Sequence, residues 1–372
     1  IALFNGGNLE EASAQFQAVL TGYNKHPKLA RVVYHLGLSL ARQKLYTEAA
    51  KQFQRISEEF AESDFADHAL YEWAWCERGD KRQEEAVKLY QILLKDHSDS
   101  SLAPKVQGEL AELNLDKGAQ DKIIADLSAT LETVEETSLR EELRYQLASA
   151  HFKKGDYSSA AAQFITLLED YPESRFLASM HFQAGESQLQ LQQVEKAQAQ
   201  FTAAVGIEGS PQSLVESITM RLAETQALTG QHSDAAASYQ TFLEKFPESR
   251  WTRNARFGFA FATENSGDPT AALVEYAKIL DEPKTDLWTA RSRFQTGSCH
   301  AALEKNNQAV IEFVKVEISY PQYPQWQAQA VLEIGKILLV QDKPDQAKER
   351  FQEVLSRFAK EEAAAAAKEL LG

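Results

Sequence analysis

The sequence predicts an all-α protein built as a stack of helical hairpins, which is a quasi-one-dimensional solenoid. Three observations predict this fold class. A block of residue types recurs every 37 or 38 residues along the chain. Within each block, apolar residues recur at intervals of three and four, the period of an amphipathic helix. Glycine and proline number only 17 and 10 among 372 residues, which is low for a loop-rich or all-β protein.

Three sets of equivalent positions define the repeat. The first is an anchor that follows a turn signal, at Ala12, Ala49, Ala86, Ile123, Ala160, Ala197, Ala235, Ala272, Ala309 and Ala347. The second is Gly or Ala before the anchor, at Gly37, Ala74, Ala111, Ala148, Gly185, Ala223, Ala260, Gly297 and Gly335. The third is a mostly aromatic residue after the anchor, at Phe16, Phe53, Tyr90, Leu127, Phe164, Phe201, Tyr239, Tyr276, Phe313 and Phe351. Because all three keep one frame, the repeat is not a coincidence.

Each repeat contains two predicted helices joined by a turn. The first helix carries the Gly or Ala position, where a larger side chain would hold two neighbouring backbones apart. The second helix carries the anchor and the aromatic residue, which we expect to fill the gap between hairpins. In one repeat, residues 143–150 mark the first helix and residues 160–168 the second. Gly155 lies between them and suits the left-handed position that ends a helix.

A second type of connection joins one hairpin to the next. Tyr171-Pro172 and Phe246-Pro247 are expected to end second helices, since proline lacks an N–H and clashes with the preceding turn. Ser174 and Ser249 follow at the place where an N-cap for the next helix is expected. These segments therefore punctuate the array at regular intervals.

We expect residues 1–372 to form a single solenoid. The first repeat is truncated at the N-terminus, because residues 1–4 fall near the end of its leading helix, so we expect the natural protein to continue upstream. The repeat at about 101–137 diverges most, and a break in stacking or simple sequence drift both account for it. Residues 359–372 are strongly helical and predict a terminal capping helix.

Charge and cysteine content argue against several classes of protein. The net charge of −15 disfavours a general nucleic-acid binder, which needs a basic face. No run of about 18 apolar residues occurs, so no transmembrane segment is expected. Cys76 and Cys299 cannot form a disulfide framework, and in an extended stack they lie too far apart to be bridged. Both are expected to be buried apolar thiols.

The sequence contains no strong signature of catalysis. It has no glycine-rich phosphate loop, no His-Glu-x-x-His pair and no Cys-x-x-Cys pair. Glutamate-rich segments such as Glu58-Glu59 are typical of solvated helix faces. We therefore expect no enzyme activity, no catalytic residues, no cofactor and no metal.

The equivalent positions resemble those of the tetratricopeptide repeat: an aromatic before a small residue, Ala, an aromatic four residues later, and Pro near the end. The resemblance covers essentially the whole chain and implies a right-handed superhelical solenoid of about ten helix-turn-helix hairpins. The standard unit has about 34 residues. Here the extra residues fall in the Tyr-Pro-Glu-Ser junction, as in bacterial cell-envelope proteins such as the outer-membrane assembly lipoproteins and the Tol–Pal coordinating protein. That likeness implies the bacterial periplasm or cell envelope.

The resemblance also implies a concave groove lined by first helices, at the second, fifth, ninth, twelfth and thirteenth places of each unit. Carried over, the candidate partner-binding residues are Arg31, Arg42, His68, Tyr71, Trp75, Arg78, Lys105 and Phe261. Arginine and aromatic residues are favoured at binding hot spots. For Tyr71, as for Tyr34, a place in the core is the alternative interpretation. The chaperone-type carboxylate clamp is not met, since Tyr71 and Trp75 stand where it needs Lys and Asn.

The resulting functional prediction is a non-catalytic scaffold for protein–protein interaction. It would bind a peptide or a segment of a partner protein in the groove, and it would not bind nucleic acid. An alternative is a structural component that self-associates within a larger cell-envelope assembly. A third reading, which the flanking sequence would decide, is the helical regulatory arm of an enzyme.

Overall fold

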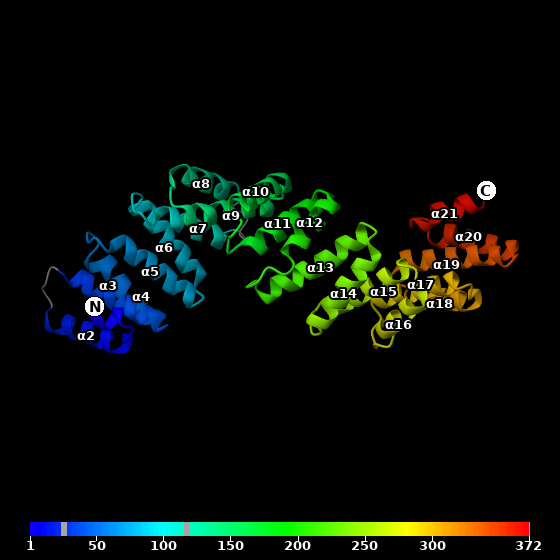
Figure 1. Cartoon of the computed structure of the whole chain (residues 1–372), viewed down its shortest axis with the longest axis horizontal. Helices are drawn as coiled ribbons and strands as arrows, with labels where there is room; N and C mark the ends of the chain where they lie inside the picture. The colour runs from blue at the N-terminus through cyan, green and yellow to red at the C-terminus, as the bar shows by residue number, and fades with distance from the viewer. Residues whose placement is uncertain (24–27, 115–119, 372) are drawn as a thin grey trace. The chain divides into compact units, whose positions relative to one another are not determined.

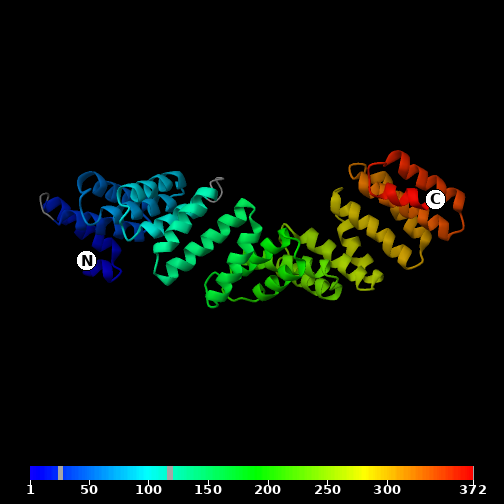
Figure 2. The ribbon, with the colours of Figure 1, turned by 90° about the horizontal axis from the view of Figure 1, so that it is seen from above.

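Helical hairpins form all the regular structure in the part of the chain that is described. The computed structural model describes residues 1–23, 28–114 and 120–371, and within these ranges it contains helices and no strands. The helices follow one another in chain order from blue to red (Figure 1), and Figure 2 shows them from above. The predicted all-α array of helix-turn-helix hairpins is confirmed.

The chain divides into two compact units, Ile1–Ser174 and Arg175–Gly372. The helices of unit 1 are α1 (Ala2–Asn5), α2 (Leu9–Gly22), α3 (Leu29–Arg42), α4 (Tyr46–Glu59), α5 (Ala66–Gly79), α6 (Gln83–Asp96), α7 (Ala103–Asn114), α8 (Gln120–Thr133), α9 (Thr137–Lys154) and α10 (Tyr157–Asp170). Those of unit 2 are α11 (Leu177–Gln190), α12 (Val194–Ala204), α13 (Gln212–Leu228), α14 (His232–Lys245), α15 (Thr252–Asn265), α16 (Pro269–Leu280), α17 (Leu287–Ala302), α18 (Asn306–Ser319), α19 (Pro324–Val340), α20 (Pro344–Arg357) and α21 (Ala363–Leu370). Within each unit, every helix packs against the next one along the chain. A single solenoid over residues 1–372 stays a prediction.

Where the small position of a repeat is glycine, at Gly37, Gly185, Gly297 and Gly335, it lies against the aromatic ring of the second helix in the same hairpin. A Cβ atom added to Gly37 would lie 2.6 Å from the ring of Phe53, and one added to Gly297 would lie 2.7 Å from the ring of Phe313. The close helix crossing is therefore as predicted, but a ring occupies it. The same rings share core clusters with the next hairpin, Phe53 with Ala69 of α5 and Phe313 with Ala330 of α19, which agrees with the expectation that they fill the gap between hairpins.

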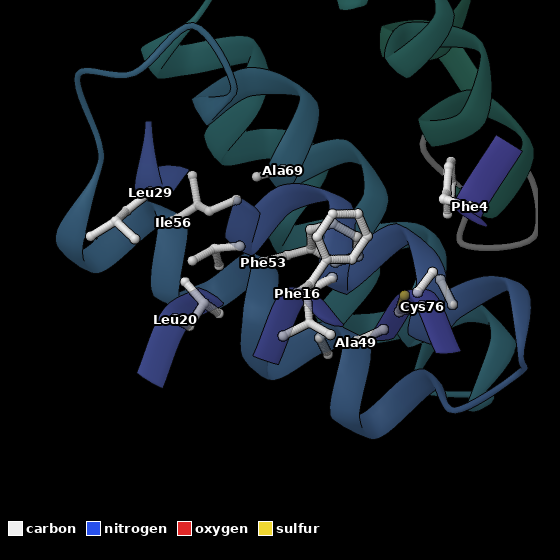
Figure 3. Close-up of a cluster of buried hydrophobic side chains, with 14 residues drawn as sticks. Phe4, Phe16, Leu20, Leu29, Ala49, Phe53, Ile56, Ala69 and Cys76 are labelled. Carbon is white, nitrogen blue, oxygen red and sulfur yellow. The ribbon is translucent and has the colours of Figure 1, made fainter. Parts of the chain in front are cut away.

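The apolar core is shared between neighbouring hairpins. Figure 3 shows a cluster in unit 1 in which Phe53 and Ile56 of α4 are fully buried, with Phe16 and Leu20 of α2 and Leu29 of α3 around them. No hairpin here buries its apolar face alone. Burial by neighbours is the main source of stability in such an array.

In every hairpin whose turn the structure describes, that is all but the one at residues 115–119, the turn places one residue in the left-handed region of backbone conformation. Gly155 has φ of 85°, which confirms the helix stop predicted there. The equivalent residues with φ between 57° and 99° are Gly7, Lys44, Lys81, Gln192, Gly230, Gly267, Glu304 and Asp342. A residue with a Cβ is strained there by roughly 1–2 kcal/mol. The hairpin geometry, more than the residue type, therefore imposes this conformation.

The junction serines join consecutive repeats. Ser249 donates a hydrogen bond to Glu216 of the preceding first helix and accepts one from the backbone N–H of Trp251 at 3.0 Å. Ser174 donates likewise to Glu141. The predicted N-cap role is wrong, because α11 and α15 are capped by the residues two positions later, Phe176 and Trp251. The serine hydroxyl instead reaches a carboxylate of the previous repeat.

The divergent repeat and the C-terminal segment are helical where they are described. In the predicted range 101–137, α7 and α8 share a core that includes Ile123 and Leu127, while residues 115–119 lie outside the described ranges. The boundary between the two compact units lies at Ser174 and not in this repeat. In the predicted range 359–372, α21 begins only at Ala363 and buries Ala363, Ala364 and Ala367 where it packs on α19 and α20. Gly372 lies outside the described residues.

Candidate functional site

The first helices of three consecutive hairpins in unit 1 surround a hollow of about 300 Å³. These helices are α3, α5 and α7. The residues that line the hollow are Leu38, Ala41, Arg42, Tyr71, Glu72, Trp75 and Lys105. Four of them, Arg42, Tyr71, Trp75 and Lys105, are among the residues that the sequence predicts for partner binding. The structure therefore brings half of the predicted set together.

Helical spacing directs these side chains to one face. Tyr71 and Trp75 are four positions apart on α5, so they lie one above the other on the same side. Ala74, three positions after Tyr71, faces the core together with the buried part of Tyr71 and is fully buried. Arg42 is the last residue of α3 and Lys105 is near the start of α7, so their long side chains project from helix ends. Their reach brings positive charge to the rim.

Tyr71 forms the fixed wall of the hollow. Its side chain is only 8% exposed, and its ring lies 6.0 Å from that of Tyr90. Its hydroxyl donates a hydrogen bond to Glu109 at 3.1 Å, and the ammonium of Lys105 lies 4.8 Å from the ring centre. Burial raises the pKa of the Tyr71 hydroxyl. Tyr71 thus has the core position that was the alternative interpretation, and it presents only an edge to the hollow.

Trp75 is the exposed aromatic residue of the site. It is 42% exposed, and its ring packs edge-on against Tyr46 at 5.7 Å. One side of the indole is therefore held by α4 while the other faces the hollow. An exposed tryptophan on a rigid helix offers a large contact area with little loss of conformational entropy.

A half-buried carboxylate lies between the cations. Burial raises the pKa of Glu72, while the charges of Lys105, His68 and Arg42 act to lower it. Among the residues that the structure describes, none forms a direct ion pair with Glu72. Sequence reasoning missed Glu72 because it lies outside the family's groove positions. Its spacing of four from His68 on α5 is the signal that could have found it.

Arg78 is engaged within the protein. Its guanidinium forms an ion pair with Glu109 and a second with Glu112 at 3.2 Å, both on α7. Glu109 also accepts the hydroxyl hydrogen bond of Tyr71. Arg78 therefore fastens α5 to α7, and it borders the hollow without lining it.

The remaining predicted residues lie apart from the hollow. Arg31 is exposed on the first turn of α3. His68 places its Nδ1 at 2.8 Å from Asp67, and its side chain is 45% exposed. Phe261 belongs to unit 2, where it stacks on Phe257 with ring centres 6.0 Å apart. The binding role of all the predicted residues stays a prediction.

The two thiols and the acidic groups show no metal-site geometry in the described part of the chain. Within residues 1–23, 28–114 and 120–371, no group of three or more His, Cys, Asp or Glu side chains could hold an ion. Cys76 and Cys299 are free and fully buried, as the sequence predicts. Burial raises the pKa of both thiols, and it brings that of Cys76 to about 12.

Models of three protein families match the chain. Residues 1–64 and residues 68–100 each match a model described as a tetratricopeptide repeat. Residues 109–266 match YfiO, described as an outer membrane lipoprotein. No curated protein sequence matches. Of the helices in the described ranges, none has the length and apolar character needed to cross a membrane.

Solved structures that resemble the chain are repeat proteins of low sequence identity. A tetratricopeptide repeat protein from Parabacteroides merdae is 15% identical, with a TM-score of 0.45, and the match covers 68% of this chain and 93% of that one. The C-terminal part of a repeat-containing protein from Cytophaga hutchinsonii is 14% identical, with a TM-score of 0.45, covering 78% and 96%. The hairpins recur through both units, the chain contains tetratricopeptide repeats at residues 1–64 and 68–100, and residues 109–266 are similar to the outer membrane lipoprotein family.

Proposed function

We propose that this chain is a non-catalytic scaffold that binds an extended segment of a partner protein across the first helices of unit 1. Tetratricopeptide repeat families generally mediate protein–protein interactions, and both family types that match here are typically non-catalytic. The hollow beside Trp75 is the proposed contact point. The partner itself is a protein or peptide whose identity the site constrains only by its chemistry.

One observation carries the proposal: an exposed indole and two cations converge on one hollow from three helices. Trp75 supplies apolar contact area, and Arg42 and Lys105 supply two positive charges against the single carboxylate of Glu72. The excess of positive charge beside an exposed indole favours a partner segment that has an acidic group next to an apolar side chain. Tryptophan and arginine are also the residues that most often dominate binding free energy.

We further propose that the protein acts in the bacterial cell envelope. The match of residues 109–266 to an outer-membrane-lipoprotein model supports this location. A scaffold at that place would hold a partner that is exported or anchored there.

The test is affinity capture from the source cell with the full chain and with a Trp75→Ala/Lys105→Ala variant. The control is Ile92→Ala, because Ile92 is 41% exposed in the same unit but lies on the second helix α6. We expect the control to retain the partners of the unmodified chain and the double variant to hold them at least about 10-fold more weakly. Unchanged capture by the double variant, with the fold intact by circular dichroism, would contradict the proposed site.

A further inference from the structure

A half-buried arginine of unit 2 lies among three aromatic rings. The Cζ atom of Arg291 on α17 is 4.2 Å from the ring centre of Phe257 on α15 and 5.2 Å from that of Trp288. It is 5.7 Å from the ring centre of Trp326 on α19. The three helices are the first helices of consecutive hairpins. The guanidinium is thus held by the face that corresponds to the hollow in unit 1.

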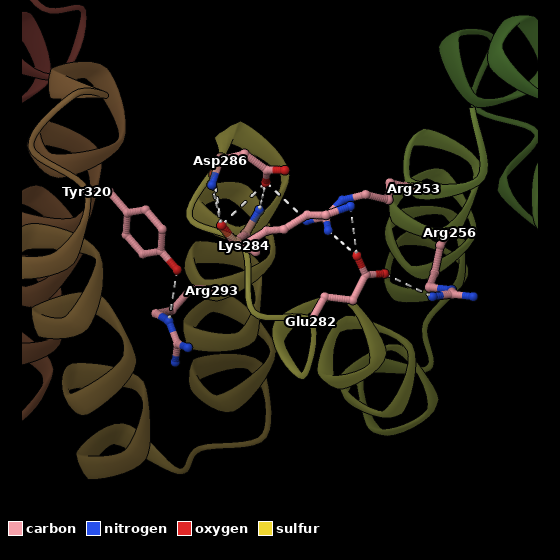
Figure 4. A network of polar contacts seen from close by, with 8 residues as sticks. Arg253, Arg256, Glu282, Lys284, Asp286, Arg293 and Tyr320 are labelled. Carbon is pink, nitrogen blue, oxygen red and sulfur yellow. Dashed lines mark hydrogen bonds and ion pairs between the residues drawn. The ribbon is translucent and has the colours of Figure 1, made fainter. Parts of the chain in front are cut away.

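Arg291 differs from every other arginine on the first helices of unit 2. Each of the others has a carboxylate partner: Arg221 with Glu186 at 2.7 Å, Arg253 with Asp286 at 3.1 Å, Arg256 with Glu282 at 3.5 Å and Arg293 with Glu312 at 2.8 Å. Figure 4 shows Arg253 and Arg256 converging on Glu282. Among the residues that the structure describes, Arg291 has no hydrogen bond or ion pair, and its Nε is buried without an acceptor.

Within the described residues, the guanidinium of Arg291 therefore lacks a hydrogen-bond acceptor and a negative charge. Burial lowers the pKa of Arg291, and the groups that act to raise it are the hydroxyls of Tyr276 and Tyr239, not a carboxylate. The faces of aromatic rings attract the guanidinium as a cation. They do not accept the hydrogen bonds that its N–H groups donate in the plane of the guanidinium. A planar group with two acceptor oxygens would satisfy the guanidinium in bidentate fashion.

The surroundings favour one carboxylate over a phosphate group. A phosphate carries close to two negative charges and is usually met by several cations. Desolvation and the hydroxyls of Tyr276 and Tyr239 are what shift the pKa of Arg291, and no cation is among these causes. Phe257 is buried in the core, and Phe261, which is half-buried, stacks on it with an interplanar angle of 13°, so Phe261 provides the apolar surface along α15 beside the guanidinium. A single negative charge next to an apolar side chain is complementary to this patch.

We propose that Arg291 anchors a second binding site, which takes an Asp or Glu side chain of an extended partner peptide and packs a neighbouring apolar side chain against Phe261. The site deepens the proposed scaffold function, on which it rests for the kind of partner. It lies in unit 2 and uses none of the residues of the hollow in unit 1, so the two can be tested separately.

The experiment probes an array of short synthetic peptides with the full chain. Peptides come in pairs that are identical except that Asp and Glu in one member are Asn and Gln in the other. We compare the unmodified chain with Arg291→Met, and with Arg293→Met as a matched control, because Arg293 is on the same helix but is paired with Glu312. The expected result is a preference for acidic members that Arg291→Met weakens by at least about 10-fold and Arg293→Met leaves unchanged.

Melting temperature separates binding from a structural role. Because Arg291→Met replaces a desolvated, unpaired charge by an apolar side chain, we expect its melting temperature to be equal to or above that of the unmodified chain. A clear fall in melting temperature without any loss of acidic peptides would assign Arg291 to packing alone and overturn the proposal.

Three further outcomes are decisive. Equal binding of both members of the pairs, or no binding of acidic peptides, overturns the site. Inorganic phosphate binding that depends on Arg291, without a preference for acidic peptides, replaces it by a phosphate site. If Trp75→Ala/Lys105→Ala loses binding of acidic peptides and Arg291→Met does not, the hollow of unit 1 alone is supported and the site at Arg291 is overturned. If Arg291→Met loses this binding and the double variant does not, the site at Arg291 is supported and the hollow is not.

Discussion

Glu264 is a carboxylate placed in the core of a hairpin. The hydroxyl of Tyr276, which is fully buried, donates a hydrogen bond to it at 2.8 Å, and the buried thiol of Cys299 bonds to it as well. These hydrogen bonds act to lower the pKa of Glu264, but burial outweighs them and raises it above the ordinary value of 4.5. The folded protein therefore holds this proton more tightly than the unfolded chain does.

The sign of the resulting pH dependence follows from linkage. A raised pKa in the folded state means that its stabilising contribution is full below pH 4.5 and is lost as pH rises through the folded pKa. Glu264→Gln, which keeps an acceptor for Tyr276, should unfold at a higher denaturant concentration than the unmodified chain at neutral pH. The difference should shrink towards pH 4.5. Each pH unit between the folded and unfolded pKa corresponds to about 1.4 kcal/mol.

Urea unfolding at several pH values checks this prediction. Glu248→Gln is the control, because Glu248 is exposed in the junction and its substitution should leave the profile parallel to that of the unmodified chain. A stability gap for Glu264→Gln that is constant with pH would show that the proton on Glu264 does not contribute.

At the scale of the single residue, position in a repeat predicted location better than it predicted partners. Trp75 lies at the hollow, as its place in the helix implies. Arg78, predicted by the same rule, is held by Glu109 from the next repeat. That ion pair depends on the distance between two helices. The spacing of residues within one helix does not predict this distance.

At the scale of the element, the hairpin turn selects one left-handed residue. Glu304 has φ of 59° and is exposed, so its side chain gains nothing that offsets the strain. Glu304→Gly should relieve roughly 1–2 kcal/mol of strain and cost about 0.5–1 kcal/mol of backbone entropy, for a net gain of up to about 1.5 kcal/mol. Differential scanning calorimetry should show a higher melting temperature.

The adjacent residue provides the matched control for this turn. Lys305 is the exposed N-cap of α18 with φ of −86°, so Lys305→Gly relieves no left-handed strain, and we expect no rise in melting temperature because the entropy cost of glycine offsets its suitability as an N-cap. If both substitutions lowered the melting temperature equally, the left-handed turn would not be a source of strain.

At the scale of the whole molecule, each hairpin is stabilised mainly by its neighbours along the chain. In such arrays stability is approximately a sum of local terms. Gly297→Leu would force a side chain into the ring of Phe313 and should cost about 1–3 kcal/mol. We expect amide hydrogen exchange to accelerate in α17, α18 and adjoining helices, and to stay unchanged in α2 to α6.

Ala302→Leu is the control for overpacking, because Ala302 is exposed at the end of the same helix and should tolerate the larger side chain. Faster exchange spread evenly over both units in Gly297→Leu would contradict local stability. Unchanged protection of the α17 amides from exchange in Gly297→Leu would also contradict it.

The sequence by itself determined the all-α class, the hairpin period, the helix stop at Gly155 and the small residue at the close helix crossing, because these depend on residues close along the chain or on a strict repeat. Only the tertiary structure decided which of the expected groove residues share one hollow, that Arg78 is fastened to α7, and that Arg291 alone among its neighbours lacks a carboxylate. Those facts depend on side-chain distances between different hairpins, and such distances are set by how the helices pack, not by spacing in the chain.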